Sequence, residues 1–208
     1  MKDSYKACFE TAVILAGGKS KRMGFDKQLL EKDHKRLTVS LAESLEKIFD
    51  QVYVVTNTPE LYEGLSVRTC SDIYPGQGPL AGIHSAFKAS GSDFLFVIAC
   101  DMTVVSPDLI RYQAARFSEA SNSTAEACII CPDGKMEPFH GFYSRSLLAD
   151  IERRLQGQRN SLTGMLMDHE ILRISREEAE EYADLTRLFR NINTPGDYKK
   201  YLETEAKQ

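Results

Sequence analysis

Short apolar runs alternate along the chain with segments of helical periodicity. The runs expected to form strands are residues 12–16, 51–56, 67–70, 94–100, 125–131, 139–143, 171–174 and 188–193. Helical spacing of apolar residues covers 37–49, 80–89, 147–155, 162–167 and a terminal segment through Tyr198 and Tyr201. Alternation of this kind is typical of a parallel sheet with helices packed against it. We therefore predict an α/β fold, a three-layer Rossmann-like, mostly parallel sheet with helices on both faces, formed by one domain over residues 1–208.

The run at 94–100 is apolar at every position and should be a central strand, buried on both faces. Asp101 follows it at once, and Ser106-Pro107 then has the cap and first-turn proline of a helix start. Ligands of open α/β sheets bind beyond the carboxyl ends of the strands. Asp101 is thus predicted to lie on the ligand-binding edge.

The loop after the first strand is rich in glycine and positive charge. It contains Gly17, Gly18 and Gly24 together with Lys19, Lys21, Arg22 and Lys27, in a chain whose formal net charge is −4. Glycine N–H groups can surround an oxyanion, and Lys and Arg add long-reach charge, so the composition indicates a phosphate-binding loop. The P-loop and dinucleotide patterns are both missing, since five residues separate Gly18 from Gly24 and Phe25 follows. The alternative is a basic hairpin at a sheet edge.

A carboxylate beside such a loop is a natural Mg²⁺ ligand, because Mg²⁺ favours one or two carboxylates together with substrate phosphates. This reasoning predicts Mg²⁺ as the cofactor and Asp101 as its ligand. The alternative for Asp101 is a turn residue or helix cap. A second loop, residues 74–83, has three glycines and two prolines and leads into a helix near Pro79. It is either a plain strand–helix connection or part of the site.

Composition narrows the function classes. A pI near 5.7 with mixed charge argues against a nucleic-acid-coating surface, and the apolar runs are too short to cross a bilayer. Five cysteines, an odd number, without an apolar secretory signal near the amino end predict a reducing, cytoplasmic location. Cys128 and Cys131 have CxxC spacing, but in a strand they should face opposite sides, which favours packing over metal binding.

One family matches these segments. Leu15-Ala-Gly-Gly-(x3)-Arg22-Met-Gly-(x2)-Lys27 resembles the signature loop of the sugar-nucleotidyltransferase-like superfamily. Within it, LAGGKSKRMGFDKQLL resembles the molybdenum cofactor guanylyltransferases, which attach GMP to molybdopterin. Further matching segments follow in order: Thr56-Asn57, Asp72 with GPLAGI, Ala99-Cys100-Asp101, EPFHGFY and Asn191 to Pro195. The resemblance therefore covers most of the chain.

The resemblance implies a set of site residues. It places the nucleotide against Leu15, Ala16, Gly17, Gly18, Lys27, Asn57, Asp72, Gly78, Leu80 and Asp101. Arg22 would bind the β- and γ-phosphates and Lys27 the α-phosphate region, with Asp101 as the third catalytic residue. Asp101 would bind Mg²⁺, and Asn193 would complete the metal or acceptor site. Arg159, in a polar loop, is the candidate contact for the phosphate of molybdopterin.

Two features depart from the family pattern. Met102-Thr103 stands where relatives often have a proline two residues after the metal aspartate, and a single residue, Phe25, stands where some have two. Neither change removes a charged group, so we expect altered loop packing. His140 could be taken for a general base, but a phosphate acceptor is already ionised at neutral pH and needs none. We interpret His140 as packing, or as an edge of the acceptor pocket.

The resemblance thus implies a Mg²⁺-dependent enzyme that transfers GMP from GTP to the phosphate of molybdopterin and releases pyrophosphate. GTP and molybdopterin are its small-molecule partners, with transient contact to other cofactor-biosynthesis proteins or apo-molybdoenzymes, and with neither nucleic acid nor membrane. Alternatives are the same chemistry with CTP, a sugar phosphate or another phosphorylated acceptor. A protein that binds nucleotide without catalysis is an alternative of a different class.

Overall fold

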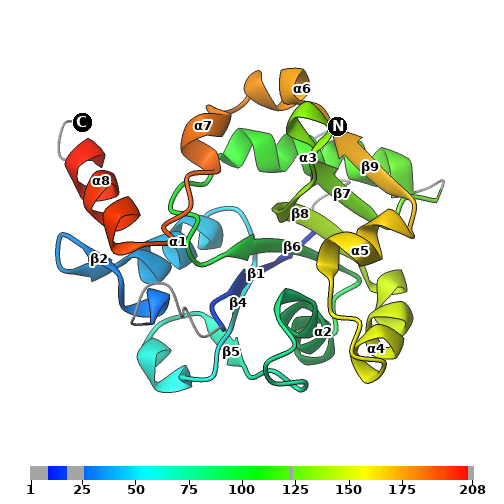
Figure 1. Ribbon diagram of the computed structural model, residues 1–208, viewed down its shortest axis with the longest axis horizontal. Helices are drawn as coiled ribbons and strands as arrows, with labels where there is room; N and C mark the ends of the chain where they lie inside the picture. The colour runs from blue at the N-terminus through cyan, green and yellow to red at the C-terminus, as the bar shows by residue number, and fades with distance from the viewer. Residues whose placement is uncertain (1–8, 18–25, 122–123, 206–208) are drawn as a thin grey trace.

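Seven strands form one sheet in the computed structural model, which describes residues 9–17, 26–121 and 124–205 (Figure 1). Their order across the sheet is β5-β4-β1-β6-β8-β7-β9. The bounds are β1 Thr11–Leu15, β4 Gln51–Val55, β5 Arg68–Cys70, β6 Phe94–Ala99, β7 Ala127–Ile130, β8 Glu137–Ser144 and β9 Ile171–Ile174. Within this sheet, β8 alone runs antiparallel to its neighbours, β6 and β7. The prediction of a mostly parallel sheet is confirmed.

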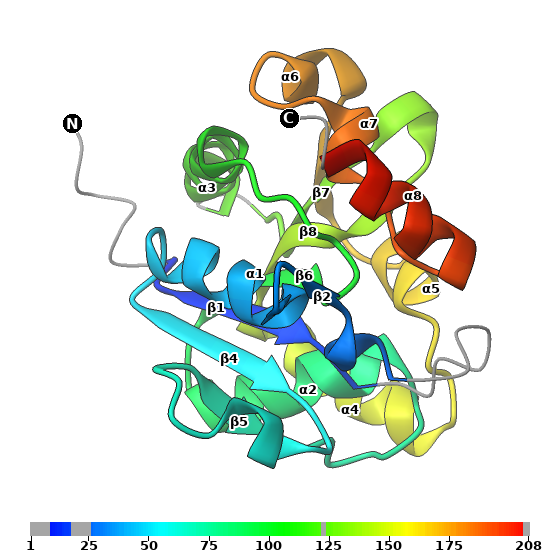
Figure 2. The ribbon, with the colours of Figure 1, turned by 90° about the vertical axis from the view of Figure 1, so that its left-hand side faces the viewer.

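Helices cover both faces of this sheet (Figure 2). One layer contains α1 (Leu37–Glu46), α3 (Pro107–Ser121), α6 (Arg176–Glu180) and α7 (Leu185–Leu188). The opposite layer contains α2 (Pro79–Ser90), α4 (Leu148–Gln156) and α5 (Leu162–Met167). None of the helices described is long and apolar enough to cross a membrane.

The apolar runs of the central strands are explained by burial on both sides. In β6, Phe96 and Ile98 pack into one core cluster, while Leu95 and Val97 pack into the other. Successive side chains of a strand point to opposite faces, so a strand covered on both sides must be apolar at every position. Cys128 and Cys131 also lie in different clusters, as their strand spacing predicted.

The first turns of the two helices that follow β5 and β6 form as predicted. Pro79 and Pro107 are the first residues of α2 and α3. Ser106 Oγ accepts a hydrogen bond from Leu109 N at 3.3 Å and so caps α3. A proline suits this position because the first helical N–H has no partner within the helix.

A small third cluster lies beside the main core and was not predicted. A hairpin of β2 (Glu31–Lys32) and β3 (Lys35–Arg36) turns through Asp33 and His34, whose φ angles are 51° and 61°. Two consecutive positive φ values are typical of a type I′ turn. The final helix, α8 (Pro195–Glu205), packs close by through Tyr201 in a cluster with Leu30, Leu37 and Ile192.

The predicted strand at residues 188–193 is wrong. Helix α7 ends at Leu188, and within the expected strand only Asn191 forms a β-bridge, an antiparallel one with Met102. The helix forms because the Asp184 side chain accepts hydrogen bonds from Thr186 N and Arg187 N. This cap accounts for α7 up to Leu188, while the residues after it are joined to the end of β6 by the Asn191–Met102 bridge and by the Ile192 N to Asp101 O hydrogen bond of 3.3 Å.

His140 lies in the core, inside β8, and is fully buried. Its Nδ1 is 3.1 Å from Gln113 Oε1, and Gln113 Nε2 donates to the backbone oxygen of His140 at 3.1 Å. Burial lowers the pKa of His140 to about 4, because a charged imidazolium would lose its hydration. The interpretation of His140 as a packing residue is confirmed.

The burial of His140 predicts how the free energy of unfolding depends on pH. The folded-state pKa of about 4 lies below the ordinary histidine pKa of 6.5, so the unfolded chain binds more protons between these pH values. The His140 contribution to the free energy of unfolding should therefore fall as the pH drops, by about 3 kcal/mol at pH 4. His140→Gln should remove this loss, measured by urea unfolding of wild type and variant from pH 7.5 to 4.

A matched control is His34→Gln. His34 is exposed, and its positive φ of 61° is similar to the φ of 71° at His140. This variant should leave the pH profile of wild type unchanged. If the difference in unfolding free energy between wild type and His140→Gln stayed constant with pH, the buried neutral histidine would be disproved.

Candidate functional site

Four loops that matter for the site leave the same edge of the sheet. The strands β1, β4, β5 and β6 are parallel, so the residues after each of them lie at one edge. The ladder continues past the strand ends, where Ala16 N donates to Val55 O at 3.0 Å and Cys100 N to Leu15 O at 3.1 Å. These bonds hold the start of each loop in register, and the loops carry Gly17, Asn57, Asp72 and Asp101.

Gly17, Asn57 and Asp72 come together at this edge. A Cβ built on Gly17 would lie 3.5 Å from Asp72 Oδ2 and 4.0 Å from Asn57 Nδ2. Gly82 of α2 borders the same group, since a Cβ there would lie 3.8 Å from Asp72 Oδ1 and only 2.8 Å from Leu15 Cδ2. The glycine at position 82 therefore allows α2 to pack close against the end of β1.

Asp72 is the chemically unusual member of this group. Its Oδ1 is buried without a hydrogen-bond partner among the described residues, and burial raises the pKa of the carboxyl group. A buried carboxylate oxygen without a donor is unfavourable, so a ligand that brings an N–H or O–H group would stabilise it. This fits the placement of Asp72 among the nucleotide contacts.

The loop from β5 to α2 supplies the other expected base contacts. Gly78 has a φ of 75° and stands at the N-cap of α2, a conformation that favours glycine. Leu80 is fully buried in the core, so Gly78 and Pro79 are the residues of this segment that are exposed to a ligand.

Lys27, Asp101 and Asn193 meet although they are far apart in sequence. Lys27 Nζ donates to Asp101 Oδ2 at 2.6 Å and to Asn193 Oδ1 at 2.8 Å. The side chains of Lys27 and Asp101 are only 16% and 14% exposed, so water screens the ion pair less than it would at the open surface.

The backbone beside each member holds this group in place. Asn193 is held near Asp101 because Ile192 N donates to Asp101 O at 3.3 Å. Asp197 Oδ2 then accepts from Asn193 N at 3.1 Å and from Thr194 N at 2.8 Å at the start of α8. The terminal segment thus closes over the end of β6.

Gln28 anchors the turn that carries Lys27, and it was not among the site residues predicted from the sequence. It is 3% exposed, and its Oε1 accepts from Thr56 Oγ1 at 2.7 Å and from Tyr62 Oη at 3.0 Å. Its Nε2 donates to Asp26 Oδ2 at 3.0 Å. A glutamine between a lysine and two leucines gives no sign of burial, so only the tertiary structure could identify it.

The donor set of this group fits Mg²⁺. Asp101 Oδ2 and Asn193 Oδ1 are hard oxygen ligands that already converge on a cationic group, the Lys27 ammonium. Within residues 9–17, 26–121 and 124–205, no cluster of three or more His, Cys, Asp or Glu residues is placed to hold a metal ion. A Mg²⁺ ion here would therefore take substrate oxygens among its ligands, as is common for this metal.

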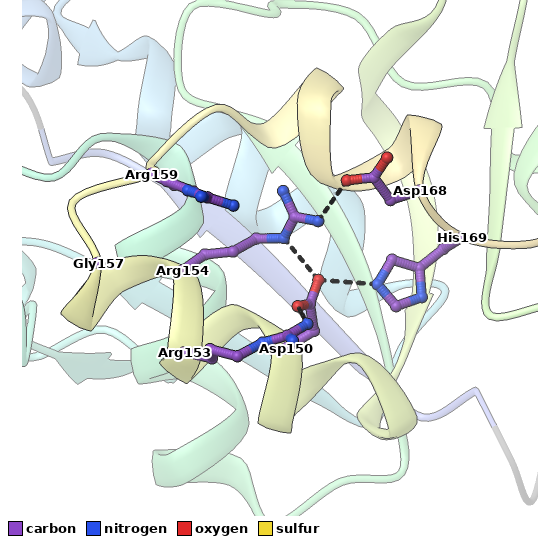
Figure 3. Close-up of a pocket in the computed structure, with 7 residues that line it drawn as sticks. All are labelled: Asp150, Arg153, Arg154, Gly157, Arg159, Asp168 and His169. Atoms are coloured by element: carbon purple, nitrogen blue, oxygen red, sulfur yellow. Dashed lines mark hydrogen bonds and ion pairs between the residues drawn. The ribbon is translucent and has the colours of Figure 1, made fainter.

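Arg159 lies in the loop between α4 and α5, on a cleft of about 610 Å³ (Figure 3). The lining residues are Asp150, Arg153, Arg154, Gly157, Arg159, Asp168 and His169. The Arg159 side chain has no hydrogen-bond or ion-pair partner among the described residues and points into the cleft toward the Arg154 side chain (Figure 3). No contact within those residues joins it to the Lys27 group.

Asp150 organises the rest of this cleft. Burial alone would raise its pKa, but hydrogen bonds from His169, Arg154 and Arg153 hold the pKa well below its usual range. Arg154 Nη2 also donates to Asp168 at 2.6 Å. Because Arg153 and Arg154 are neutralised in this way, Arg159 is the guanidinium of the cleft that remains available for an anion.

The described residues thus include all but two of the predicted site residues. Gly18 and Arg22 lie outside them, as do the loop cations Lys19 and Lys21. Leu15, Ala16 and Gly17 lie at the end of β1, beside Asn57 and Asp72, while Lys27, Asp101 and Asn193 form the second group.

Comparisons with known proteins agree with this geometry. The sequence matches the MobA-like NTP transferase domain family over residues 12–172. It is 41% identical over 193 residues to the molybdenum cofactor guanylyltransferase of Syntrophotalea carbinolica, covering 93% of this chain and 90% of the relative. A probable molybdenum cofactor guanylyltransferase of Peptoclostridium acidaminophilum is 37% identical over 202 residues, covering 96% of this chain and 91% of the relative.

A solved structure supports the fold. The molybdopterin-guanine dinucleotide biosynthesis protein A of Archaeoglobus fulgidus superposes with a TM-score of 0.82 at 24% identity, covering 95% of this chain and 100% of that one. At this identity the likeness establishes the three-layer architecture alone.

Proposed function

Because the chain belongs to the MobA-like NTP transferase family, we propose that it is a molybdenum cofactor guanylyltransferase, which transfers GMP from GTP to the phosphate of molybdopterin. The observation that carries the proposal is the meeting of Lys27, Asp101 and Asn193 at the edge where the Gly17, Asn57 and Asp72 loops also end. The first group suits a metal-bound phosphate chain and the second a base and ribose. The cytoplasmic location predicted from the sequence is part of the proposal.

The nucleotide lies along the ends of the parallel strands. Its base and ribose rest against the backbone of residues 15–18, with Asn57, Asp72 and the Gly78–Leu80 segment around them. The free Oδ1 of Asp72 accepts a hydrogen bond from the nucleoside. Lys27 binds the α-phosphate region, and Arg22 binds the β- and γ-phosphates.

The reaction needs no covalent nucleophile from the protein. An oxygen of the molybdopterin phosphate attacks the α-phosphorus of GTP in line, the bond from that phosphorus to the β-phosphate bridging oxygen breaks, and pyrophosphate leaves. The protein contributes position and charge compensation, in which Lys27 and Arg22 stabilise the charge on the transferring group and on pyrophosphate. Asp101 and Asn193 would hold Mg²⁺, and the chemistry that the ion would supply there is polarisation of the α-phosphoryl oxygen.

The acceptor approaches from the side of the α4–α5 cleft. Its phosphate is bound by Arg159, whose guanidinium is unpaired among the described residues. A planar guanidinium can form two parallel hydrogen bonds to a phosphate. Asn193 borders the position where donor and acceptor phosphates meet.

The proposal predicts the nucleotide preference. With molybdopterin and Mg²⁺, pyrophosphate release should be at least about tenfold faster with GTP than with CTP or ATP, a difference of about 1.4 kcal/mol in transition-state binding. The measurement is a coupled pyrophosphate assay with equal concentrations of each nucleotide. A preference for CTP would assign a cytidylyltransferase, and GTP binding without any pyrophosphate release would favour a nucleotide-binding protein without catalysis.

A second prediction concerns Asp101. Asp101→Asn should lower turnover by at least about 100-fold, as for the loss of one electrostatic stabiliser, because the amide carries no charge for Mg²⁺. The variant should remain folded, because the amide oxygen can still accept a hydrogen bond from Lys27 Nζ. Asp108→Asn, a highly exposed carboxylate on α3, is the matched control and should keep full turnover. Turnover of Asp101→Asn within a few-fold of wild type would remove Asp101 from the metal site.

A third prediction tests whether Arg159 contacts molybdopterin, the acceptor, and not GTP, the donor. Arg159→Ala should raise the KM for molybdopterin by about tenfold or more, with little change in the KM for GTP, since a charged hydrogen bond contributes roughly 1.5–3 kcal/mol. Arg111→Ala, an exposed arginine on α3, serves as the control. Equal effects of Arg159→Ala on both KM values would contradict an acceptor contact.

A further inference from the structure

Lys27 occupies the position that the proposed function assigns to the metal ion. Its Nζ lies 2.6 Å from Asp101 Oδ2 and 2.8 Å from Asn193 Oδ1, the two oxygens assigned to Mg²⁺. We propose that Lys27 is a latch that excludes a divalent cation from Asp101 until a nucleotide draws the lysine away. Metal and nucleotide then bind as one unit. This inference rests on the proposed function, because it assumes that phosphates arrive beside Lys27.

The exclusion follows from charge and space. Mg²⁺ binds oxygens at about 2.1 Å, so on Asp101 it would lie within a few ångströms of the ammonium group that already donates to Asp101 Oδ2. The pair is shielded from water, with exposures of 16% and 14%, so repulsion between the two cations would be strong. An incoming metal ion must therefore displace Lys27.

The lysine can move without any change in the backbone. Leu30 N donates to Lys27 O at 3.2 Å, and the Asp26 side chain caps the short turn at Lys27 by accepting from Gln28 N. The buried Gln28 side chain then ties this turn to Thr56 and Tyr62. The flexible four-carbon side chain of Lys27 can therefore rotate from Asp101 to the phosphates of a nucleotide while its backbone stays fixed.

A nucleotide supplies the alternative partner. A triphosphate carries more negative charge than one carboxylate, so it competes for the Lys27 ammonium and brings its own metal ion to Asp101. Asn193 stays in place during this exchange, because Asp197 holds its backbone at the start of α8. The exchange thus prevents a metal ion from binding at Asp101 before the nucleotide does.

The test uses Mn²⁺ as a probe, with free Mn²⁺ measured by electron paramagnetic resonance in the absence of nucleotide. Lys27→Met keeps the length of the side chain and removes its charge. This variant should bind Mn²⁺ at least about tenfold more tightly than wild type. Lys88→Met is the matched control, because Lys88 also forms an ion pair, with Glu152 at 2.6 Å, and lies on α2 outside the site. It should bind Mn²⁺ as wild type does.

The double variant Lys27→Met/Asp101→Asn assigns the site. It should lose the gain in Mn²⁺ affinity, and a gain that persists would place the ion elsewhere and overturn the proposal. Lys27→Gln repeats the measurement if Lys27→Met does not give the circular dichroism spectrum of wild type. Mn²⁺ affinity of a folded Lys27 variant equal to that of wild type would also overturn the latch.

The latch and the enzymatic function fail in different ways. If the Lys27 variant binds Mn²⁺ no more tightly while wild type still releases pyrophosphate from GTP and molybdopterin, the latch is wrong and the function stands. If the variant gains affinity and wild type releases no pyrophosphate with any acceptor, the latch stands as a property of the site and the function is wrong.

Discussion

The common direction of β1, β4, β5 and β6 is the constraint on which the site depends. Parallel strands end at one edge, so the residue types that follow each strand gather there without any local sequence relation. Gly17, Asn57, Asp72 and Asp101 each come two residues after the last residue of a strand. The hydrogen-bond ladder continues beyond the strand ends and determines where each loop leaves the sheet. The rest of the chain shapes and closes this edge.

Hydrogen bonds within the protein hold the backbone of the site residues in place before a ligand binds. Asp26 and Gln28 hold the turn at Lys27, while Asp197 and the Ile192–Asp101 backbone bond hold Asn193. Preorganised groups stabilise a transition state without reorganising during the reaction. The ion pair of Lys27 and Asp101 belongs to the same design, because it keeps two opposite charges paired within a poorly hydrated region.

In the α4–α5 cleft, which we propose as the acceptor side, charged side chains are arranged in another way. Asp150 and Asp168 neutralise Arg154, and Asp150 also pairs with Arg153. Among the described residues of this cleft, Arg159 keeps an unpaired guanidinium. Three arginines close together would repel one another, so the partly buried Asp150 and the exposed Asp168 neutralise two of them and, in our proposal, leave Arg159 for a phosphate. In our proposal, the donor and acceptor phosphates meet between this cleft and the strand ends.

Sequence reasoning failed where a residue's role depends on a distant partner. The segment 188–193 has strand-like composition, yet helix α7 ends at Leu188 and the segment forms a single described β-bridge, from Asn191 to Met102. The buried position of Gln28 also could not be predicted, because its partners Thr56 and Tyr62 are remote in the chain. The complete burial of Leu80, a predicted nucleotide contact, was also not indicated by the loop sequence around it.

The sequence by itself determined the layered α/β architecture and most of the strands and helices, and it singled out Lys27 and Asp101 as candidate site residues. These depend on local information: apolar runs mark buried strands, proline and serine mark helix starts, and the spacing of glycines and cations marks the phosphate loop. Only the tertiary structure decided that Lys27 pairs with Asp101 and Asn193, that the terminal segment closes over β6, and that Arg159 remains unpaired. These contacts join residues that are far apart in the chain, so they depend on how the whole chain packs rather than on any local pattern.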